Sequence, residues 1–348
     1  MKQTILVTGG TGYIGSWVVK GLLENGHTVR LTVRNISQKK KYEFLKVIAE
    51  ESEGSIEIWE ADLLKIGSFD EAAKGCDSII HLASPFKLNI KDAQTELVDP
   101  AVKGTTNLLE AANKSGSVKK VVLTSSVVAI YGDNIDMRNQ NLSIFTETHF
   151  NTTSSLSHQP YAYSKVEAEK KAWAMAKQQS NWELVVMNPS FVMGPSLASI
   201  SESESLTFMT DMLSGKFKMG TAELYMGFVD VRDVAKAHIF GLENKVDGRF
   251  ILSERVTDML SFSNIIRAHY GKRYPLPKSN NPKWLVSLIG VFFGLSRKYV
   301  KNNVGIPIQL DSSKSMDQLG LTYIPLEQTV KDMVDQWESA QKTTAEQK

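Results

Sequence analysis

The sequence contains a single cysteine, Cys76, among its 348 residues. One cysteine excludes an internal disulfide bond and is typical of proteins kept in a reducing compartment. The opening stretch, MKQTILVTGG, lacks the apolar region and the small-residue cleavage site of a secretory signal peptide. We therefore expect a cytoplasmic protein.

The sequence also lacks a strong excess of charge and any clustering of metal ligands. Its formal net charge is +2 with 22% charged residues, whereas nucleic-acid-binding proteins usually carry a marked basic excess. The six histidines are scattered, and none pairs with a cysteine or a carboxylate at the spacing of a metal site. Both absences predict a protein that binds neither nucleic acid nor a metal ion.

The most apolar segment is too short to cross a bilayer, which takes about 20 apolar residues. This segment, WLVSLIGVFFGL, covers residues 284–295. We expect it to form a buried helix of a C-terminal lobe. Contact with a membrane surface is the alternative, because the flanking Lys283, Arg297 and Lys298 suit anionic lipids.

What the sequence does contain is a glycine-rich turn between a strand and a helix. VTGGTGYIG, residues 7–15, overlaps a β-rich run at 3–8 and opens a segment whose apolar residues recur at helical spacing. A second β-rich run follows at 27–34. Strand, glycine turn, helix and strand form a βαβ unit, which is the context in which such a turn binds the phosphates of a dinucleotide.

Strands and helices continue to alternate along the chain. Further strands are predicted at 55–62, 77–84, 118–126, 183–190 and 248–253. Long helical stretches lie between them, including DPAVKGTTNLLEAANKSG and YAYSKVEAEKKAWAMAKQQSN. This alternation predicts an α/β fold with a Rossmann-type, doubly wound parallel sheet.

The pattern loosens after Pro189, which predicts a smaller, mostly helical C-terminal lobe that binds the substrate. A Ser-rich stretch at 196–216 is expected to form a loop and a helix over a pocket. The predicted domain bounds are 1–190 with about 227–253 for nucleotide binding, and about 191–226 with 254–340 for the substrate lobe. The polar tail at 341–348 is expected to fray.

The end of the second strand indicates which dinucleotide the chain binds. Proteins that prefer NAD usually carry Asp or Glu there, which accepts hydrogen bonds from the ribose 2′-hydroxyl. This sequence has Arg34 instead, and a guanidinium suits the 2′-phosphate of NADP(H). Lys39, Lys40 and Lys41 follow, but such a basic run is commonly a solvated loop. We therefore predict NADP(H) as the cofactor, with Arg34 as its main basic contact.

Other contacts with the cofactor are expected around the same strand ends. Gly9, Gly12 and Gly15 would allow a tight turn, close approach to the pyrophosphate and close packing of helix on strand. Asp62 ends the third strand, where a carboxylate can meet the adenine amino group. The remaining expected contacts are Tyr13, Ile14, Leu63, Leu82, Ala83, Ser84 and Ser125. His81, which precedes Leu82, is expected to be a packed strand histidine.

Two later segments carry residues suited to carbonyl reduction: TSS closes a strand, and YAYSK opens a helix. Tyr161 and Lys165 lie four residues apart and share a helix face, so the ammonium would stabilise the phenolate and lower the pKa of the tyrosine. A serine of the first segment would donate a hydrogen bond to the substrate carbonyl. Spacing leaves both Ser125 and Ser126 open. Tyr163 is a weaker alternative to Tyr161, because no lysine follows it at the fourth position.

In this order, these segments resemble the extended short-chain dehydrogenase/reductase family. The likeness is to its dihydroflavonol-reductase-like branch, which includes plant dihydroflavonol and cinnamoyl-CoA reductases as well as aldehyde and methylglyoxal reductases. It covers nearly the whole chain, through VTGGTGYIGSWVVKGLLENGHTVRLTVRN, LTSSVVAIYG, YAYSKVEAEKKAW, VMNPSFVMGPSL and FVDVRDVAKAHI.

The resemblance implies a role for particular residues. The implied catalytic set is Ser126, Tyr161 and Lys165, and Lys165 would also hold the nicotinamide ribose. The further implied contacts are Pro189, Ser190 and Val192 near the nicotinamide, and Lys41 beside the 2′-phosphate. Together they imply an NADPH-dependent reductase that transfers hydride to a carbonyl, with Tyr161 as the proton donor.

The sequence departs from plant flavonoid reductases at positions that touch the flavonoid in that branch. Their asparagine after the catalytic serine is matched here by Ala129, Ile130 and Tyr131. Their glutamine before the FVDVRDV segment is matched by Met226 or Gly227, so we expect a smaller aldehyde or ketone as the substrate. The candidate pocket residues are Tyr131, Met193, Met226 and Gly227, with Phe208, Met209, Met212 and Tyr225 as further apolar ones. Each of the apolar side chains could equally pack the core of the lobe.

Two other functions fit parts of the pattern. Sugar-nucleotide epimerases and dehydratases share the serine, tyrosine and lysine, but they usually retain NAD, which Arg34 disfavours. A cofactor-sensing regulator would bind NADP without turnover, but such proteins commonly lose the tyrosine or the lysine. The long helices near 100–114 and 161–179 are compatible with a monomer and with a homodimer that pairs them.

Overall fold

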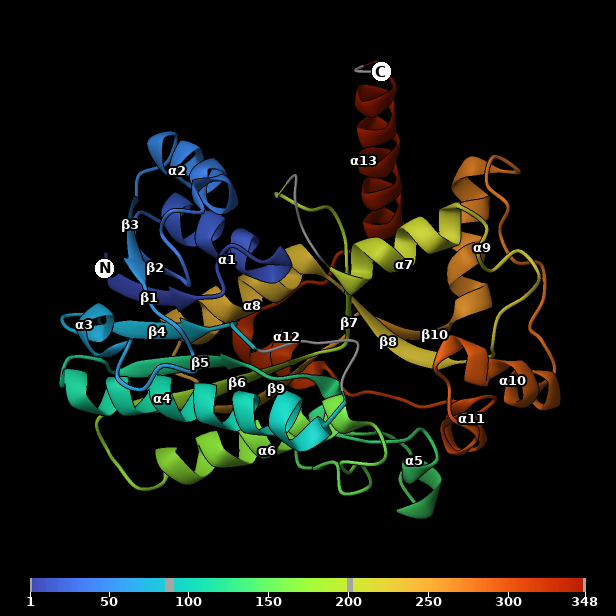
Figure 1. Ribbon diagram of the computed structural model, residues 1–348, viewed down its shortest axis with the longest axis horizontal. Coiled ribbons are helices and arrows are strands. Elements are labelled where there is room, and N and C mark those ends of the chain that lie inside the picture. The colour runs from blue at the N-terminus through green and yellow to red at the C-terminus, as the bar shows by residue number, and fades with distance from the viewer. Residues whose placement is uncertain (1, 85–90, 199–202, 347–348) are drawn as a thin grey trace.

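A computed structural model describes residues 2–84, 91–198 and 203–346. Part of the predicted Ser-rich loop, residues 199–202, lies outside the described residues. The centre of the molecule is a seven-stranded parallel sheet in the order β3-β2-β1-β4-β5-β6-β9 (Figure 1). Its strands are β1 (Thr4–Thr8), β2 (Thr28–Val33), β3 (Ser55–Glu60), β4 (Ser78–His81), β5 (Lys120–Thr124), β6 (Glu183–Pro189) and β9 (Gly248–Leu252).

Each of these strands lies within the range predicted for it, and the doubly wound parallel sheet is confirmed. Alternate side chains of a strand point to opposite faces of the sheet. Ile5 and Val7 of β1 accordingly pack into one buried cluster, whereas Leu6 packs into another on the opposite face. The inner strands β1 and β4 are buried at almost every position because helices cover the sheet on both sides, whereas the edge strand β3 is not.

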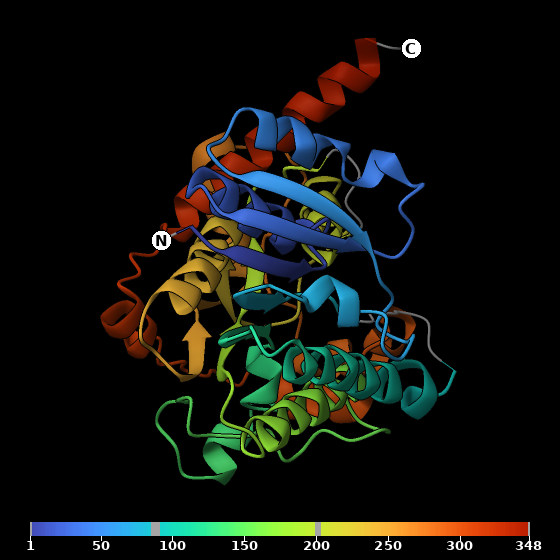
Figure 2. The same cartoon turned by 90° about the vertical axis from the view of Figure 1, so that its left-hand side faces the viewer.

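Figure 2 shows these two helical layers, with the sheet between them. On one face lie α1 (Tyr13–Glu24), α2 (Glu43–Glu50) and α8 (Val231–Glu243), and on the other lie α3 (Asp70–Ala73), α4 (Asp99–Ser115) and α6 (Pro160–Ala176). Short helical turns connect some of these elements: η1 (Lys39–Lys41), η2 (Gln94–Val98), η3 (Val127–Ala129) and α5 (Asp136–Asn139). Val18 and Leu22 of α1 are fully buried one turn apart, as the apolar spacing predicts.

The rest of the chain is mostly helical, as predicted, and carries a second, three-stranded sheet in the order β10-β8-β7. Its strands are β7 (Phe191–Met193), β8 (Tyr225–Asp230) and β10 (Arg255–Asp258). Its helices are α7 (Glu204–Leu213), α9 (Met259–Tyr270), α10 (Lys283–Ile289), η4 (Gly290–Phe293), α11 (Arg297–Asn303), α12 (Ser313–Leu319) and α13 (Leu326–Glu346). The tail that was expected to fray is therefore helical as far as Glu346.

The FVDVRDV segment joins the two parts of the molecule. Its strand, β8, was assigned to the nucleotide-binding domain, but it pairs with β7 and β10 in the second sheet. Its helix, α8, packs against α1 on the central sheet. The chain thus crosses between the two parts more than once, and the exact domain bounds remain a prediction.

The prediction of a buried helix at 284–295 was wrong. Trp284, Leu288, Val291 and Phe292 are exposed to between 56% and 88%. Val286 alone of the α10 side chains is buried, against Val300 and Val304. Most of the segment is exposed because α10 and η4 are short and the buried cluster beside them is small, so few of their side chains can reach it. No helix in the described ranges is long and apolar enough to cross a bilayer.

The geometry of the first turn requires two of its glycines. Gly9 has a φ of +71°, and a Cβ there would lie 2.7 Å from the backbone nitrogen of Ala83. A Cβ on Gly15 would lie 2.1 Å from the carbonyl oxygen of Gly9, because α1 packs directly on the turn. Such distances are far below van der Waals contact, so no larger residue fits at either position.

A pair of matched substitutions tests this requirement. Gly75 has a φ of +72° but would place a Cβ with nothing within 4 Å. Gly75→Ala should therefore lower the free energy of unfolding by only about 1–2 kcal/mol, the cost of left-handed backbone. Gly9→Ala should lower it by about 3 kcal/mol or more, because crowding adds to the same backbone cost. Equal losses in urea unfolding would show that crowding at Gly9 is unimportant.

Candidate functional site

A cleft of about 530 Å³ lies at the carboxyl ends of the central strands, between them and β7, β8 and α11. This is the edge at which open α/β sheets bind their ligands, and the volume suits a small molecule. The predicted residues that line it are Gly9, Gly12, Tyr13, Ile14, Gly15, Leu82, Ser84, Ser125, Ser126, Tyr131, Tyr161, Lys165, Pro189, Ser190, Val192, Met226 and Gly227. Residues predicted from segments far apart in the sequence thus meet in one cavity.

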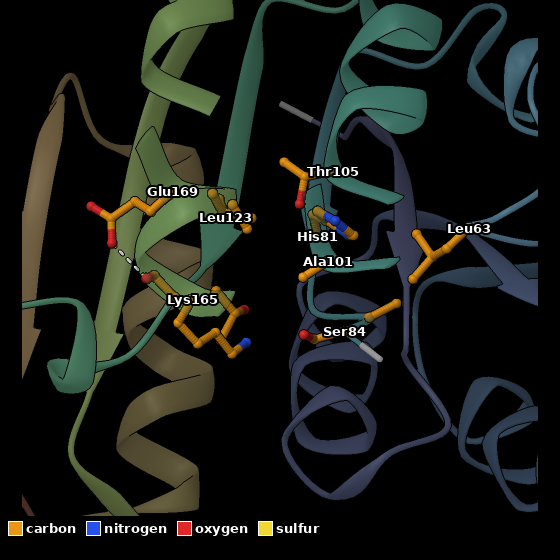
Figure 3. Close-up of a pocket in the computed structure, with 12 residues that line it drawn as sticks. Leu63, His81, Ser84, Ala101, Thr105, Leu123, Lys165 and Glu169 are labelled. Carbon is orange, nitrogen blue, oxygen red and sulfur yellow. Dashed lines mark hydrogen bonds between the residues drawn. The ribbon is translucent and has the colours of Figure 1, made fainter. Parts of the chain in front are cut away.

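Two predicted cofactor residues line a smaller cavity that adjoins the cleft, since Ser84, Ser125 and Lys165 line both. Leu63 and Ala83 line a small cavity of about 20 Å³ between the strand ends and α4 and α6. Figure 3 shows this cavity, with Lys165 and Glu169 on one side and His81 and Ser84 on the other.

His81 is fully enclosed by the fold. Its Nδ1 lies 2.7 Å from the hydroxyl of Thr8. Burial, reinforced by the nearby Lys165 ammonium, lowers the pKa of His81 to about 3. A neutral, hydrogen-bonded ring of this kind packs the strand and cannot serve as a proton donor near neutral pH.

The predicted contacts with the adenosine half lie at the outer rim. Arg34 and Lys41 are exposed just beyond β2, and Arg34 forms no ion pair with any described residue. Because Thr8 of β1 pairs in register with Thr32 of β2, Arg34 emerges at the same sheet edge as the glycine turn. Asp62 is half-buried, and its Oδ1 accepts a hydrogen bond from the backbone N–H of Leu64 at 2.9 Å.

Met193 does not line the cleft, so that prediction was wrong. It is fully buried in the core of the second lobe, together with Met209, Met212 and Phe228. The face of the β7–β8 strand pair that carries Met193 packs against α7, α9 and α13, and the unbranched thioether of Met193 fills the space between the strands and these helices. Phe208 packs against the same cluster, whereas Tyr225 does line the cleft.

The first turn of α1 is suited to bind an anion. Gly12 is its N-cap and supplies no side-chain cap, and no acidic residue lies in the first turn. The backbone N–H groups and the helix dipole therefore offer positive potential to a phosphate group. At the other end of the cleft, the buried Oγ of Ser190 has no hydrogen-bond partner among the described residues. These residues fit a dinucleotide, with the pyrophosphate at α1 and a polar group near Ser190.

Tyr161 and Lys165 both face the cleft from the first turns of α6. The Nζ of Lys165 lies 5.9 Å from the centroid of the Tyr161 ring. Tyr161 keeps 36% of its surface exposed, but desolvation raises its pKa to about 12, so the expectation that Lys165 lowers this pKa was wrong. Burial lowers the pKa of Lys165 to about 8. At neutral pH the phenol therefore holds its proton while the lysine is charged, which suits a group that donates a proton.

The structure distinguishes the two serines of the TSS segment. Ser125 is buried, and its hydroxyl donates to Oε2 of Glu169 at 2.5 Å. The Oγ of Ser126 accepts a hydrogen bond from the backbone N–H of Val128 at 3.3 Å, which leaves its own proton available to the cleft. The geometry therefore favours Ser126 over Ser125 as a donor to a ligand. Tyr163 is half-buried on α6 and is absent from the described lining of the cleft.

A buried ion pair beneath this site was not predicted from the sequence. Oε1 of Glu169 lies 2.6 Å from Nε of Arg249, and Glu169 is inaccessible to solvent. Oε2 also accepts a hydrogen bond from Asn188 Nδ2 at 3.0 Å, beside that from Ser125. The carboxylate thus ties α6 to the ends of β5, β6 and β9. Glu169 lies one helical turn after Lys165, so its place near the site could have been predicted from the sequence. Arg249 could not, because it comes from the distant strand β9.

A second unpredicted cluster joins α6 to the C-terminal lobe. Asp133 is buried and accepts hydrogen bonds from His158, Gln159, Asn302 and Asn303 at 2.6–2.7 Å. His158 and Gln159 immediately precede α6, and Asn302 and Asn303 end α11. The start of the helix that carries Tyr161 is therefore fixed to the far wall of the cleft.

Comparison with known proteins agrees with this geometry. The model of the NAD dependent epimerase/dehydratase family matches residues 5–251. Cinnamoyl-CoA reductase CAD2 of Medicago truncatula is 35% identical over 340 residues, which cover 96% of this chain and 95% of the relative. Dihydroflavonol 4-reductase of Gerbera hybrida is 31% identical over 272 residues, covering 78% and 74%. The crystal structure of Gre2 from Candida albicans in complex with NADPH matches with a TM-score of 0.78 at 32% identity, covering 97% and 99%.

The fold, the glycine turn and the site define a nicotinamide-dependent oxidoreductase of the short-chain dehydrogenase/reductase type. The chain belongs to the NAD dependent epimerase/dehydratase family, whose model matches most of the length of the chain. Its relatives confirm the predicted dihydroflavonol-reductase-like branch.

The buried ion pair generates a prediction about stability. Glu169→Gln should lower the free energy of unfolding by about 3–5 kcal/mol, because Arg249 would remain buried without its counter-charge. Glu167→Gln, on the same helix, removes a partly exposed pair with Lys170 and should change it by less than about 0.5 kcal/mol. Urea unfolding of both variants measures the difference. Similar small losses would mean that Arg249 finds solvent or another partner.

Proposed function

We propose that the protein is an NADPH-dependent reductase that converts a small aldehyde or ketone to an alcohol, with Tyr161 as the proton donor. The observation that carries the proposal is the meeting of Ser126, Tyr161 and Lys165 with the glycine turn in one cleft. Two similar proteins support the proposal: one is a cinnamoyl-CoA reductase, CAD2, and the other, Gre2, was crystallised with NADPH.

The cofactor-binding residues are those at the sheet edge. The N-terminus of α1 and the glycine turn bind the pyrophosphate, and Arg34 pairs with the 2′-phosphate. Ser190 and Lys165 contact the nicotinamide half. When bound, NADPH supplies the hydride that adds to the carbonyl carbon of the substrate.

The side chains of α6 and β5 manage the proton and the developing charge. The hydroxyl of Ser126 donates a hydrogen bond to the carbonyl oxygen, which becomes negative as the hydride arrives. Tyr161 transfers its phenolic proton to that oxygen, so the product is a neutral alcohol. The Lys165 ammonium, charged below pH 8, then stabilises the phenolate until solvent returns a proton.

The lining of the cleft favours an uncharged substrate. Among its described residues, Lys165 and Glu204 alone carry a charge. A sugar nucleotide would bring a second diphosphate, and arginine or lysine side chains on the substrate side would favour its binding. Tyr131, Tyr225 and Met226 instead offer aromatic and apolar surface. An aldehyde or ketone with an apolar body therefore fits better than the substrate of an epimerase.

The role of Tyr161 is tested by paired tyrosine variants. Tyr161→Phe should lower kcat for NADPH-dependent reduction by about 10²–10⁴-fold, the usual contribution of a general acid. Tyr163→Phe removes a hydroxyl from the same helix outside the cleft and should leave kcat within about threefold of the wild type. NADPH oxidation against a panel of aldehydes, ketoaldehydes and a dihydroflavonol measures this. Turnover that survives in Tyr161→Phe would contradict the assignment, and NADPH binding with no turnover of any carbonyl by the wild type would favour a regulator.

The role of Arg34 is tested by its effect on the two nicotinamide cofactors. Arg34→Leu should weaken NADPH binding by about 10- to 100-fold, because a charge-assisted hydrogen bond contributes about 1.5–3 kcal/mol. NADH binding should change little, since NADH lacks the 2′-phosphate. Lys40→Leu, in the same basic stretch, serves as the control and should shift NADPH affinity by less than about threefold. Equal losses for NADPH and NADH in fluorescence titrations would contradict this role.

A further inference from the structure

The C-terminal lobe presents an apolar surface that nothing in the cleft chemistry uses. We name it the Trp284 patch, and it consists of Trp284, Leu288, Val291 and Phe292 on α10 and η4. These side chains are 69%, 59%, 56% and 88% exposed. Trp284 and Leu288 are one helical turn apart, and Val291 and Phe292 follow in the next turn, so the four side chains lie near one another. Clustered exposed apolar side chains mark interaction surfaces.

The charge around the patch is segregated from the rest of the chain. Residues 259–310 contain no Asp or Glu, but they contain eight Lys and Arg residues, in a protein whose formal net charge is only +2. Arg273, at the far side of the lobe, is paired with Glu338 of α13. By contrast, Arg297, Lys298 and Lys301 beside the patch are exposed and form no ion pair with a described residue.

The cations and the apolar side chains occupy one end of the molecule. Figure 1 shows α10 and α11 together at the end of the long axis opposite α3, with α5 beside them. Arg138 of α5 adds to the local positive potential, and with burial it lowers the pKa of Lys283. Helices α10 and α11 are therefore neighbours in space as well as along the chain, and α5 joins them from a distant part of the sequence (Figure 1).

We propose that the Trp284 patch binds the surface of an anionic lipid bilayer. Tryptophan and phenylalanine prefer the interfacial region of a membrane, and short helices with basic flanks lie in its plane. The unpaired cations of α11 would face the negative headgroups while the patch enters the acyl boundary. A bilayer matches both the apolar and the basic part of this surface.

A second copy of the chain matches it less well. A two-fold dimer through the patch would bring the same exposed Arg297, Lys298 and Lys301 of both copies close together, and like charges repel. The membrane-facing end also adjoins the cleft, since Tyr299 and Asn303 of α11 line that cavity. Binding of the Trp284 patch to a bilayer would therefore hold the mouth of the cleft near the lipid surface, and no helix would need to cross the bilayer.

The experiment is co-sedimentation of the full chain with vesicles of phosphatidylcholine, with and without phosphatidylserine. The wild type should sediment with the anionic vesicles, and this binding should fall as salt is raised. The double variant Trp284→Ser with Phe292→Ser should bind at least about tenfold more weakly. Arg297→Gln and Lys298→Gln should each weaken binding about fivefold, the effect of one cation near an anionic surface.

A matched control lies at the other end of the molecule. Ile66, which is 86% exposed before α3, is changed to serine and should leave vesicle binding unaltered. Unchanged NADPH affinity and thermal midpoint show that each variant is folded. Failure of the wild type to sediment with anionic vesicles would overturn the proposal, as would undiminished binding by the double serine variant. A concentration-dependent dimer that this variant abolishes, without vesicle binding, would assign the patch to a second copy instead.

Discussion

The geometry of the site depends on the ion pair and the hydrogen bonds made by the buried carboxylate of Glu169. It accepts hydrogen bonds from Ser125 and Asn188 and pairs with Arg249, so one buried charge fixes α6 against the ends of β5, β6 and β9. Charge taken out of water is tolerated only when each of its acceptor sites is matched, as it is here. Lys165 lies one turn away on the same helix, and the position of the lysine in the cleft follows from this anchor.

The same enclosure sets the protonation states that the proposed chemistry needs. Desolvation acts in opposite directions on the two proposed catalytic groups, because it raises the pKa of a phenol and lowers that of an ammonium. Tyr161, at about 12, stays protonated, while Lys165, at about 8, remains charged at neutral pH. An oxidised nicotinamide cofactor would carry a positive charge, and together with the Lys165 ammonium it would stabilise a phenolate at Tyr161. Tyr161 is therefore protonated before any substrate arrives, as the proposed mechanism requires.

The two ends of the molecule show how differently apolar residues can be used. In β1, Ile5, Leu6 and Val7 are all buried, because helices cover both faces of the sheet. In α10 and η4 a comparably apolar stretch leaves Trp284 and Phe292 in solvent, because, of the described α10 side chains, Val286 alone is buried in the small cluster with Val300 and Val304. Apolar character alone does not distinguish a core segment from a binding surface.

The sequence by itself determined the order of strands and helices along the chain and the glycine turn, since these depend on local periodicity and on motifs at short spacing, and it proposed Tyr161, Lys165 and one serine of the TSS segment as site residues. Only the tertiary structure showed that Met193 packs a core, that 284–295 is exposed and that β8 belongs to a second sheet. It alone brought Arg249 to Glu169 and Asp133 to α11, through contacts between residues far apart in the chain. Such partners leave no periodic trace in one sequence, because their choice depends on how complete elements pack in three dimensions.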